Sequence, residues 1–328
     1  MSNEPLLVKD LGEQSLLKRL QRFCPADVVG DDGAILITDP DRSLVVTTDV
    51  LVDGVHFSDR TTDPFDVGWR SCAANLSDLA AMGATPLGIT VGLSLPGEKT
   101  VFWVEEVYRG IDACLKTAST FLVGGDVCRS PVTSLAITAF GEVLPNKAIR
   151  RDRARVGDVI VVTGLHGLSR GGLELLLDPD RGKDLEPAER RKLIEAHQRP
   201  KPRLDVLPYL AAVPDVAGMD SSDGLADAIV QICQCSRVGA IVNGSSLTIY
   251  SGLSKLAKEM AWEWLLYGGE DFELVLCLPK NSASNLVEQI GGDAAIIGEI
   301  TTTSEIKVVY ENSNVEKILD ISKGFQHF

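Results

Sequence analysis

Aspartates stand at the ends of apolar segments along this chain of 328 residues. Residues 30–35 read GDDGAI, in which Asp31 and Asp32 lie between two glycines just before an apolar run. Aspartate and glycine are also the common residues of surface turns, so this stretch by itself is typical of a turn. Whether this stretch is only a turn or part of a chemical site therefore depends on the acidic residues further along the chain.

Those further acids lie where predicted strands end or predicted helices begin, which is where α/β proteins place their binding sites. They are Asp126 after FLVGG, Asp220 and Asp223 in MDSSDGL, and Glu270 in YGGEDF, while Asp49, preceded by Thr47 and Thr48, lies within an apolar predicted strand. Asp78 lies inside NLSDLAAMG, a helical segment of small and apolar residues. A carboxylate buried there needs a partner to offset its desolvation, whereas a solvated Asp78 needs none, and the sequence leaves both open.

If the fold gathers these acids, hard cations with oxygen ligands must neutralise them, which favours Mg²⁺ over zinc. Mg²⁺ keeps several waters and binds together with substrate phosphates, so the pattern predicts phosphoryl transfer. The stretch GLHGLSRGG at 164–172 follows a strand and opens a helix, and its backbone N–H groups are candidates for holding an anion. A plain strand-to-helix connection explains it nearly as well, because the chain has no Walker A motif.

Composition argues against several classes of partner. The chain has 46 acidic and 32 basic residues, and its net charge of −14 repels nucleic acid and anionic lipid. Seven cysteines are scattered without a C-x-x-C pair, which predicts reduced thiols in a cytoplasmic protein and no zinc site. No apolar stretch approaches the length of a membrane span, so neither a membrane nor a nucleic acid is an expected partner.

The elements that must position the acids form two α/β halves. In the first half, strands are predicted at 43–52, 86–96, 121–126 and 132–144, with helices at 64–83 and 100–119. A basic stretch at 145–158 breaks this pattern, and we place a boundary there between domains 1–146 and 147–328. The second half alternates strands and helices again, so the predicted class is α/β (α+β).

Seven motifs occur in the order of a known enzyme family and span almost the whole chain. They are GDDGA, TTDVLVDGVHF, NLSDLAAMGATP, VGGDVCRSP, MDSSDGL, YGGEDFEL and the terminal GFQHF. On these motifs the chain resembles the thiamine-monophosphate kinases, members of the aminoimidazole-ribonucleotide-synthetase-like superfamily. The resemblance implies that superfamily's two-domain fold. An N-terminal mixed sheet with helices pairs sheet to sheet in a homodimer, and a C-terminal α/β domain completes the ATP and substrate site.

The resemblance also implies an activity. Members transfer the γ-phosphate of ATP directly, in line, to thiamine monophosphate, giving thiamine diphosphate and ADP in the last step of thiamine diphosphate biosynthesis. Several Mg²⁺ ions, with ATP as co-substrate, follow from the same resemblance. Two alternatives stay open, namely an ATP-dependent enzyme like aminoimidazole ribonucleotide synthetase and a nucleotide-binding scaffold without turnover.

Site residues carry over from the family motifs onto the matching positions of this chain. The metal set implied is Asp32, Thr47, Thr48, Asp49, Asp78, Asp126, Asp220 and Asp223. The catalytic residues implied are Asp49, Asp78, Asp126 and Asp223. The ATP set is Tyr108, Gly125, Asp126, Arg151 and Ser222, and the substrate set is His56, Glu270 and Phe325. Phe325 stands where the family's terminal G-Y-D-H-F has tyrosine, and Asp31 is left as a turn residue beside Asp32.

Overall fold

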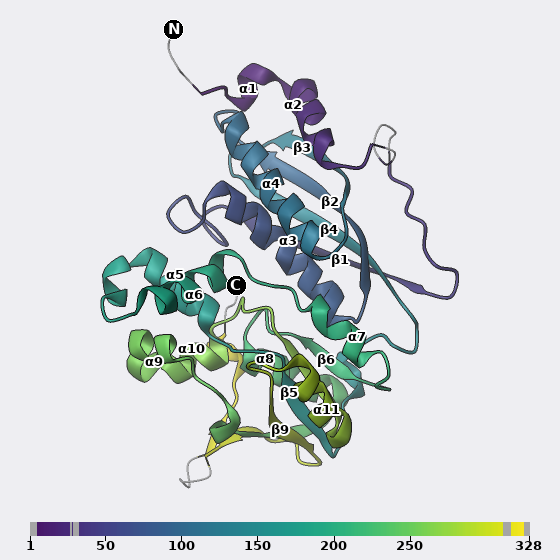
Figure 1. The fold of residues 1–328 in the computed structure, drawn as a ribbon, viewed down its shortest axis with the longest axis vertical. Coiled ribbons are helices and arrows are strands. Elements are labelled where there is room, and N and C mark those ends of the chain that lie inside the picture. Colours follow the sequence, from purple (N-terminus) through teal and green to yellow (C-terminus); the bar gives the residue numbers. More distant parts are fainter. Residues whose placement is uncertain (1–4, 27, 29–32, 311–315, 325–328) are drawn as a thin grey trace. The chain divides into compact units, whose positions relative to one another are not determined.

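The computed structural model describes residues 5–26, 28, 33–310 and 316–324. The chain divides into two compact units, which Figure 1 shows as ribbons. Unit 1 is Met1–Leu79 with Thr85–Val143, and unit 2 is Ala80–Ala84 with Leu144–Phe328. The division predicted after residue 146 therefore falls close to the end of unit 1. Residues 80–84, which belong to unit 2 although they lie between two segments of unit 1, were not predicted as part of unit 2, because this assignment depends on packing rather than on a local sequence pattern.

Unit 1 contains, among its described residues, a four-stranded sheet in the order β1-β4-β2-β3. The strands are β1 (Ser43–Val52), β2 (Thr85–Leu95), β3 (Leu122–Arg129) and β4 (Ser134–Val143). β4 is antiparallel to β1 and β2, whereas β2 and β3 are parallel. The bounds of β1 are those predicted, since its β-branched run SLVVTTDVLV favours a strand throughout.

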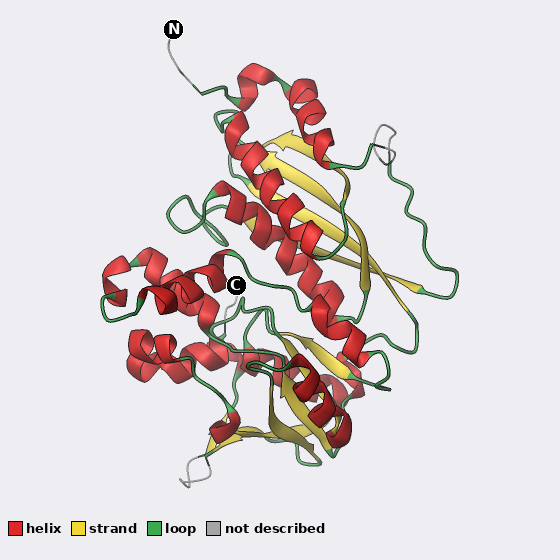
Figure 2. Ribbon diagram, viewed as in Figure 1, coloured by secondary structure: helices red, strands yellow, loops and turns green. Residues whose placement is uncertain are grey.

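Two long helices, α3 (Pro64–Ala81) and α4 (Val101–Thr117), run side by side across one face of this sheet (Figures 1 and 2). Proline suits the first turn of α3. α4 begins after Thr100, whose hydroxyl accepts the N–H of Trp103 at 3.0 Å and caps the helix. The shorter α1 (Val8–Leu11) and α2 (Glu13–Leu20) precede the sheet. These helices bury one face of the sheet.

The two faces of the first sheet differ in burial. Ile89 and Val91 of β2 and Ile137 of β4 are completely buried on the helix side. On the other side, Val46 and Val50 of β1 are 53% and 49% exposed. We refer to this second side as the open face, formed by Leu44, Val46, Thr48, Val50, Thr90, Gly92, Ala136, Thr138 and Phe140. Within the described part of unit 1, no helix covers the open face.

Glycines allow α3 and α4 to approach until their backbones touch. A Cβ added at Gly68 of α3 would overlap the carbonyl oxygen of Val107, and a Cβ at Gly110 of α4 would overlap that of Phe65. Only glycine fits at either position, because the atoms in the way belong to the facing backbone rather than to a flexible side chain. This crossing fixes α3, which carries the predicted ligand Asp78, against its neighbour.

Unit 2 is built, in the described residues, on a seven-stranded sheet in the order β11-β10-β7-β9-β5-β8-β6. The strands are β5 (Asp158–Val162), β6 (Ala217–Asp220), β7 (Gly239–Asn243), β8 (Leu274–Pro279), β9 (Ala295–Thr301), β10 (Ile306–Val309) and β11 (Glu316–Ile318). The helices are α5 (Leu168–Leu177), α6 (Pro187–Gln198), α7 (Leu207–Leu210), α8 (Leu225–Ser236), α9 (Ser251–Ala257), α10 (Ala261–Tyr267) and α11 (Lys280–Ile290).

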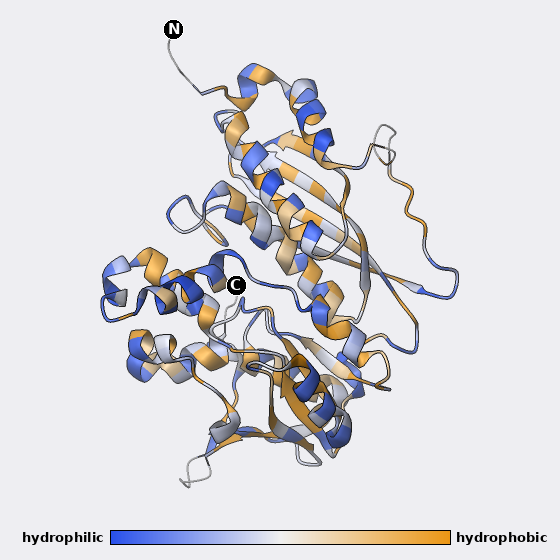
Figure 3. Cartoon of the chain, viewed as in Figure 1, coloured by the Kyte–Doolittle hydropathy of each residue, from blue (hydrophilic) through white to orange (hydrophobic). Residues whose placement is uncertain are grey.

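Helices cover both faces of the second sheet at its centre. Ile160 of β5 packs in one core cluster with Ile229 of α8, whereas Val161 packs in another with Leu286 of α11. Burial on both sides explains why β5 and β8 are apolar runs without alternation, and Figure 3 colours most of this sheet as hydrophobic. None of the described helices has the length and apolar character that a membrane span requires.

Replacing Gly110 by alanine is expected to lower the free energy of unfolding by about 3 kcal/mol, because the added methyl group meets the α3 backbone. Helix propensity alone predicts the opposite sign, a gain of about 1 kcal/mol. Urea unfolding measures the difference, and Lys116→Ala, an exposed position on the same helix, is the control. An unchanged or raised midpoint for Gly110→Ala would show that the helix crossing is loose.

Candidate active site

In unit 1, hydrogen bonds between β1 and α3 bring three predicted ligands together. The Thr47 hydroxyl donates to the carboxylate of Asp78. The backbone N–H of Asp49 donates to Asn75 Oδ1 at 3.1 Å, and Asn75 Nδ2 donates to the carbonyl of Ser71 at 3.0 Å, which fixes the orientation of the amide. α3 therefore holds β1 so that Thr47 and Asp49 lie beside the helix that carries Asp78.

Thr48 and Asp126 lie on the open face of the same sheet, away from that group. The Thr48 and Thr138 hydroxyls are 2.9 Å apart in the β1–β4 ladder. Asp126 is exposed, and two residues further along β3 the sulfur of Cys128 lies 3.0 Å from Ser94 Oγ. Because side chains alternate along a strand, the sheet divides the predicted metal ligands of unit 1 between its two faces. The roles of Thr48 and Asp126 as ligands stay predictions.

Two residues predicted to contact the nucleotide have well-defined surroundings. Tyr108 is 3% exposed, and its ring centroid lies 5.8 Å from that of Phe23. Burial, with a smaller effect of nearby Cys24, raises the pKa of the Tyr108 phenol far above its usual value, so the hydroxyl stays a neutral donor. Gly125 has to be glycine, since a Cβ there would overlap the carbonyl oxygen of Val91 on the neighbouring strand.

His56 closes the turn that follows β1. Its Nδ1 accepts the N–H of Val52 at 3.0 Å, and its own backbone N–H donates to the Val52 carbonyl at 2.9 Å. In the neutral ring the hydrogen therefore sits on Nε2, which makes that nitrogen a donor. The turn thus presents His56 as a hydrogen-bond donor at the end of the strand that carries Asp49.

In unit 2, two adjoining loops carry most of the predicted site residues of that unit. Asp220 ends β6 and is 3% exposed, and its Oδ1 accepts the Ser222 hydroxyl at 2.9 Å. The N–H of Glu270 donates to the carbonyl of Ser222 at 2.6 Å, which joins the loop 220–224 to the loop 268–273. Asp223 lies in the first of these loops. This hydrogen bond between the two loop backbones brings together Asp220, Ser222 and Asp223 of the first loop and Glu270 of the second.

Arg151 lies beside the same strand. The carbonyl of the preceding residue, Arg150, accepts the N–H of Gly218 in β6 at 3.2 Å. The Arg151 guanidinium donates to Gln231 Oε1 of α8 at 2.6 Å. The side chain is therefore held against α8, the helix that begins just after Asp223.

The loop 268–273 has a strained backbone that buried hydrogen bonds hold in place. Glu270 and Phe272 have φ angles of 57° and 53°, in the left-handed region that side chains disfavour. Between them, the Asp271 carboxylate accepts the N–H groups of Gly167 at 2.6 Å and Ser169 at 2.8 Å, at the start of α5. Burial raises the pKa of Asp271 to about 7 in spite of these two donors.

The donor set fits Mg²⁺ in kind. In the described residues, no group of three or more His, Cys, Asp or Glu side chains is close enough to hold a metal ion. Unit 1 brings together the Thr47 hydroxyl and the Asp78 carboxylate, and Asp49 is held near them through its backbone N–H. The side chains of all three offer oxygen donors, which suit Mg²⁺ rather than zinc. Asp32 and Phe325 lie outside the described residues.

Family models match most of the chain. Residues 30–143 match the AIR synthase related protein, N-terminal domain, and residues 155–311 match the AIR synthase related protein, C-terminal domain. The thiamine-monophosphate kinase of Synechococcus elongatus is 50% identical over 98% of this chain and 98% of its own length. The chain belongs to the thiamine-monophosphate kinase family. The thiamine-monophosphate kinase of Prochlorococcus marinus is 39% identical over 99% of this chain and 98% of its own length.

Solved structures of thiamine-monophosphate kinases share the fold. The crystal structure of the enzyme from Stenotrophomonas maltophilia matches with a TM-score of 0.79 and 36% identity, over 89% of this chain and 95% of that chain. The structure of AaThiL complexed with AMPPCP and TMP matches with a TM-score of 0.76 and 31% identity over 100% of both chains. The predicted family, the two-domain α/β fold and the enzyme class, an ATP-dependent kinase, are confirmed.

The sequence prediction gave no role to several residues that hold the predicted ligands, or the loops that carry them, in place. Asn75 orients β1, Asp271 anchors the strained loop, and Glu273 joins three loops. All three lie inside the recognised motifs. Glu273 also directly precedes the apolar strand β8, but Asp271 and Glu270 of the same motif lie two and three residues before it, so the sequence does not single it out.

Proposed function

We propose that this chain transfers the γ-phosphoryl group of ATP directly to the phosphate of thiamine monophosphate, giving thiamine diphosphate and ADP. The observation that carries the proposal is the 50% identity, over 98% of both chains, to the thiamine-monophosphate kinase of Synechococcus elongatus. The AaThiL complex with AMPPCP and TMP supports the same two substrates. Among the predicted ligands, Asp220 ends β6 and Asp223 lies in the loop that follows, whereas Asp49 lies within β1.

Mg²⁺ is the metal that the oxygen donors favour. Thr47, Asp49 and Asp78 would hold it in unit 1, and Asp220 and Asp223 in unit 2, with Asp32, Thr48 and Asp126 as further members of the predicted set. When bound, Mg²⁺ supplies neutralisation of phosphate charge. Such neutralisation is needed, because two anionic substrates must meet on a protein whose net charge is −14.

The surroundings of the possible nucleophiles support direct transfer without a phosphoenzyme. His166 is 3% exposed and burial lowers its pKa to about 4, and His197 is buried with its Nδ1 3.1 Å from Ser169 Oγ. Burial raises the pKa of Cys24 to about 11 and that of Cys233 to about 12, so neither forms a thiolate near neutral pH. The acceptor phosphate is itself an ionised nucleophile, so a strong general base is not required.

The remaining predicted residues would bind and orient the substrates. Tyr108, Gly125, Arg151 and Ser222 would contact ATP. His56 would donate from Nε2 to the phosphate of thiamine monophosphate. Glu270 would place a carboxylate near the cationic thiazolium ring, and Phe325 would pack against the thiamine rings. In each case the chain's part is to position reacting groups, which is the main source of catalysis in phosphoryl transfer.

A coupled ADP-release assay across a panel of phosphate acceptors tests the proposed function. We expect ADP and thiamine diphosphate in equal amounts with thiamine monophosphate, and little ADP with thiamine or with aminoimidazole ribonucleotide precursors. With the acceptor withheld, γ-³²P-ATP should leave no labelled protein. Absence of ADP release with thiamine monophosphate would favour a binding scaffold, and a labelled protein would establish a phosphoenzyme instead of direct transfer.

Asp78→Asn is expected to lower kcat by at least ~100-fold while changing stability little. The substitution removes the negative charge but keeps the volume and an acceptor for the Thr47 hydroxyl. Steady-state kinetics and thermal melting measure the two effects, and Asp112→Asn, an acid on α4 paired with Lys116, is the matched control. Near-normal turnover of Asp78→Asn would mean that Asp78 is an ordinary solvated acid.

The open face supports a homodimer. Leu44, Val46 and Val50 leave apolar side chains 53%, 53% and 49% exposed along one strand, and Ala136 and Phe140 continue this surface on β4. Contiguous exposed apolar surface of this kind marks an interaction site. Pairing of two open faces about a two-fold axis would bury both at once and agrees with the sheet-to-sheet dimer that the family resemblance implies.

Val46→Arg is expected to convert the dimer to monomer at micromolar concentration, because pairing about the two-fold axis would bury two unpartnered charges. Sedimentation velocity measures the change in mass. Phe102→Arg, at an apolar side chain that is 64% exposed on α4, is the control and should leave the dimer intact. A wild-type protein that sediments as a monomer, or a Val46→Arg protein that stays dimeric, would rule out pairing through this face.

A further inference from the structure

Glu273 lies where three loops of unit 2 meet. We define loop A as residues 163–169, loop B as 220–224 and loop C as 268–273. The backbone carbonyl of Glu273 accepts the N–H of Ser221 in loop B at 2.9 Å. Its carboxylate accepts the Thr163 hydroxyl of loop A at 2.5 Å and fills the space that a Cβ at Gly164 would need. One residue therefore contacts all three loops.

Arg203 holds the Glu273 carboxylate from a fourth segment of the chain. Its Nη1 donates to Glu273 Oε2 at 2.5 Å and to the backbone carbonyl of Thr163 at 2.6 Å. On the other side of the guanidinium, Nε and Nη2 both donate to the Asp205 carboxylate at 3.0 Å. The Arg203 and Glu273 side chains are only 13% and 18% exposed, whereas that of Asp205 is 63% exposed. The ion pair is thus shielded on its Glu273 side and open to water on its Asp205 side.

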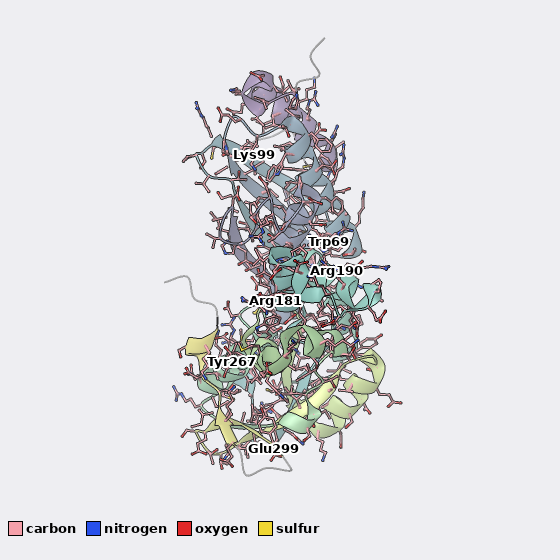
Figure 4. All side chains as sticks on the ribbon, turned by 90° about the vertical axis from the view of Figure 1, so that its left-hand side faces the viewer. Trp69, Lys99, Arg181, Arg190, Tyr267 and Glu299 are labelled. Atoms are coloured by element: carbon pink, nitrogen blue, oxygen red, sulfur yellow. The ribbon has the colours of Figure 1, made fainter. Side chains whose placement is uncertain are left out.

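Loop C needs such support because its backbone is strained. It begins directly after Tyr267, the last residue of α10, which Figure 4 labels. Gly269, Glu270 and Phe272 all have positive φ, and a strained backbone persists only where its surroundings enforce it. Two sets of contacts hold the conformation of loop C. The backbone N–H of Glu270 donates to Ser222 in loop B, and at the end of the loop the Glu273 carboxylate accepts from Arg203.

We propose that Arg203 and Glu273 are positioning residues that set the geometry of loops B and C, and through it the affinity for thiamine monophosphate. Neither residue contacts substrate in this account. Arg203 acts through Glu273 and Thr163, and Glu273 acts through the loop that carries Glu270. The inference rests on the proposed function, which assigns Glu270 to the acceptor.

The direct test compares Glu273→Gln with Asp205→Asn in steady-state kinetics. Glutamine keeps the volume but loses the charge that holds Arg203. We expect the KM for thiamine monophosphate to rise by about tenfold or more and the KM for ATP to stay within about threefold, because misplaced binding groups cost affinity for the substrate they contact. ATP is affected less because, of its predicted contacts, only Ser222 lies in loops A to C, whereas Tyr108, Gly125 and Asp126 belong to unit 1. Asp205→Asn, which weakens only the exposed side of Arg203, should behave like the wild type. Equal effects of both variants, or unchanged constants for Glu273→Gln, would overturn the proposal.

A second set of variants separates positioning from stability. Arg203→Lys keeps the positive charge but loses the planar guanidinium that donates to two carboxylates at once. It should therefore retain part of the affinity for thiamine monophosphate that Arg203→Met loses. The double variant Arg203→Met with Glu273→Gln removes both charges, so its melting temperature should recover toward the wild type while its KM for thiamine monophosphate stays high. If the melting temperature and the KM for thiamine monophosphate both return toward the wild-type values, the ion pair serves stability alone and the inference is overturned.

Amide hydrogen exchange distinguishes a failure of this inference from a failure of the proposed function. In Glu273→Gln without any substrate, the amides of Ser221 and Glu270 should exchange faster than in the wild type, while those of β5 stay protected. Faster exchange in Glu273→Gln, together with a wild-type protein that lacks kinase activity, would retain the positioning role and reject the function. Unchanged exchange in Glu273→Gln, together with an active wild-type enzyme, would reject the positioning role.

Discussion

The electrostatic cost of holding carboxylates in place governs both units of this protein. Two of the predicted ligands accept a hydroxyl hydrogen bond, Asp78 from another segment of the chain and Asp220 from within its own loop. Asp78 accepts the hydroxyl of Thr47, and Asp220 accepts that of Ser222. These donors orient the carboxylates without supplying positive charge, so cations that bind with the phosphates remain necessary for neutralisation. Backbone glycines and strained loops are the structural consequence, because the segments must approach closely for such bonds to form.

The first sheet separates two tasks by its faces. Its helix side carries Thr47 and Asp49 beneath α3, and its open face carries exposed valines together with Thr48. The tight crossing of α3 and α4 makes this separation possible, because it lets two helices cover one side of the sheet completely. In unit 2, the second sheet is covered on both faces, and its loops carry most of the predicted site residues of that unit instead.

Local sequence patterns predicted the long elements of the fold well. β1, α3 and α4 have strong propensities and clear caps, and their predicted bounds agree with the structure to within about two residues. The helices α9, α10 and α11 and the short strands β10 and β11 were not predicted. All of these except α11 have seven residues or fewer, and segments of that length carry little periodicity. The sequence prediction put Thr47, Thr48 and Asp49 of the motif TTD into one set of metal ligands. Side chains alternate along a strand, so Thr48 lies on the other face of the sheet from Thr47 and Asp49. Arg203 and Glu273 are 70 residues apart, and no local pattern reveals a contact of that range.

Isothermal titration calorimetry of ATP with and without Mg²⁺ tests the central claim most directly, namely that the predicted acidic ligands form a cation-dependent phosphate site. The account predicts clear ATP binding in the presence of Mg²⁺ and its collapse when EDTA removes divalent ions. ATP binding that is equally tight without divalent ions would contradict the account, because the predicted acidic ligands would then repel the nucleotide rather than share cations with it.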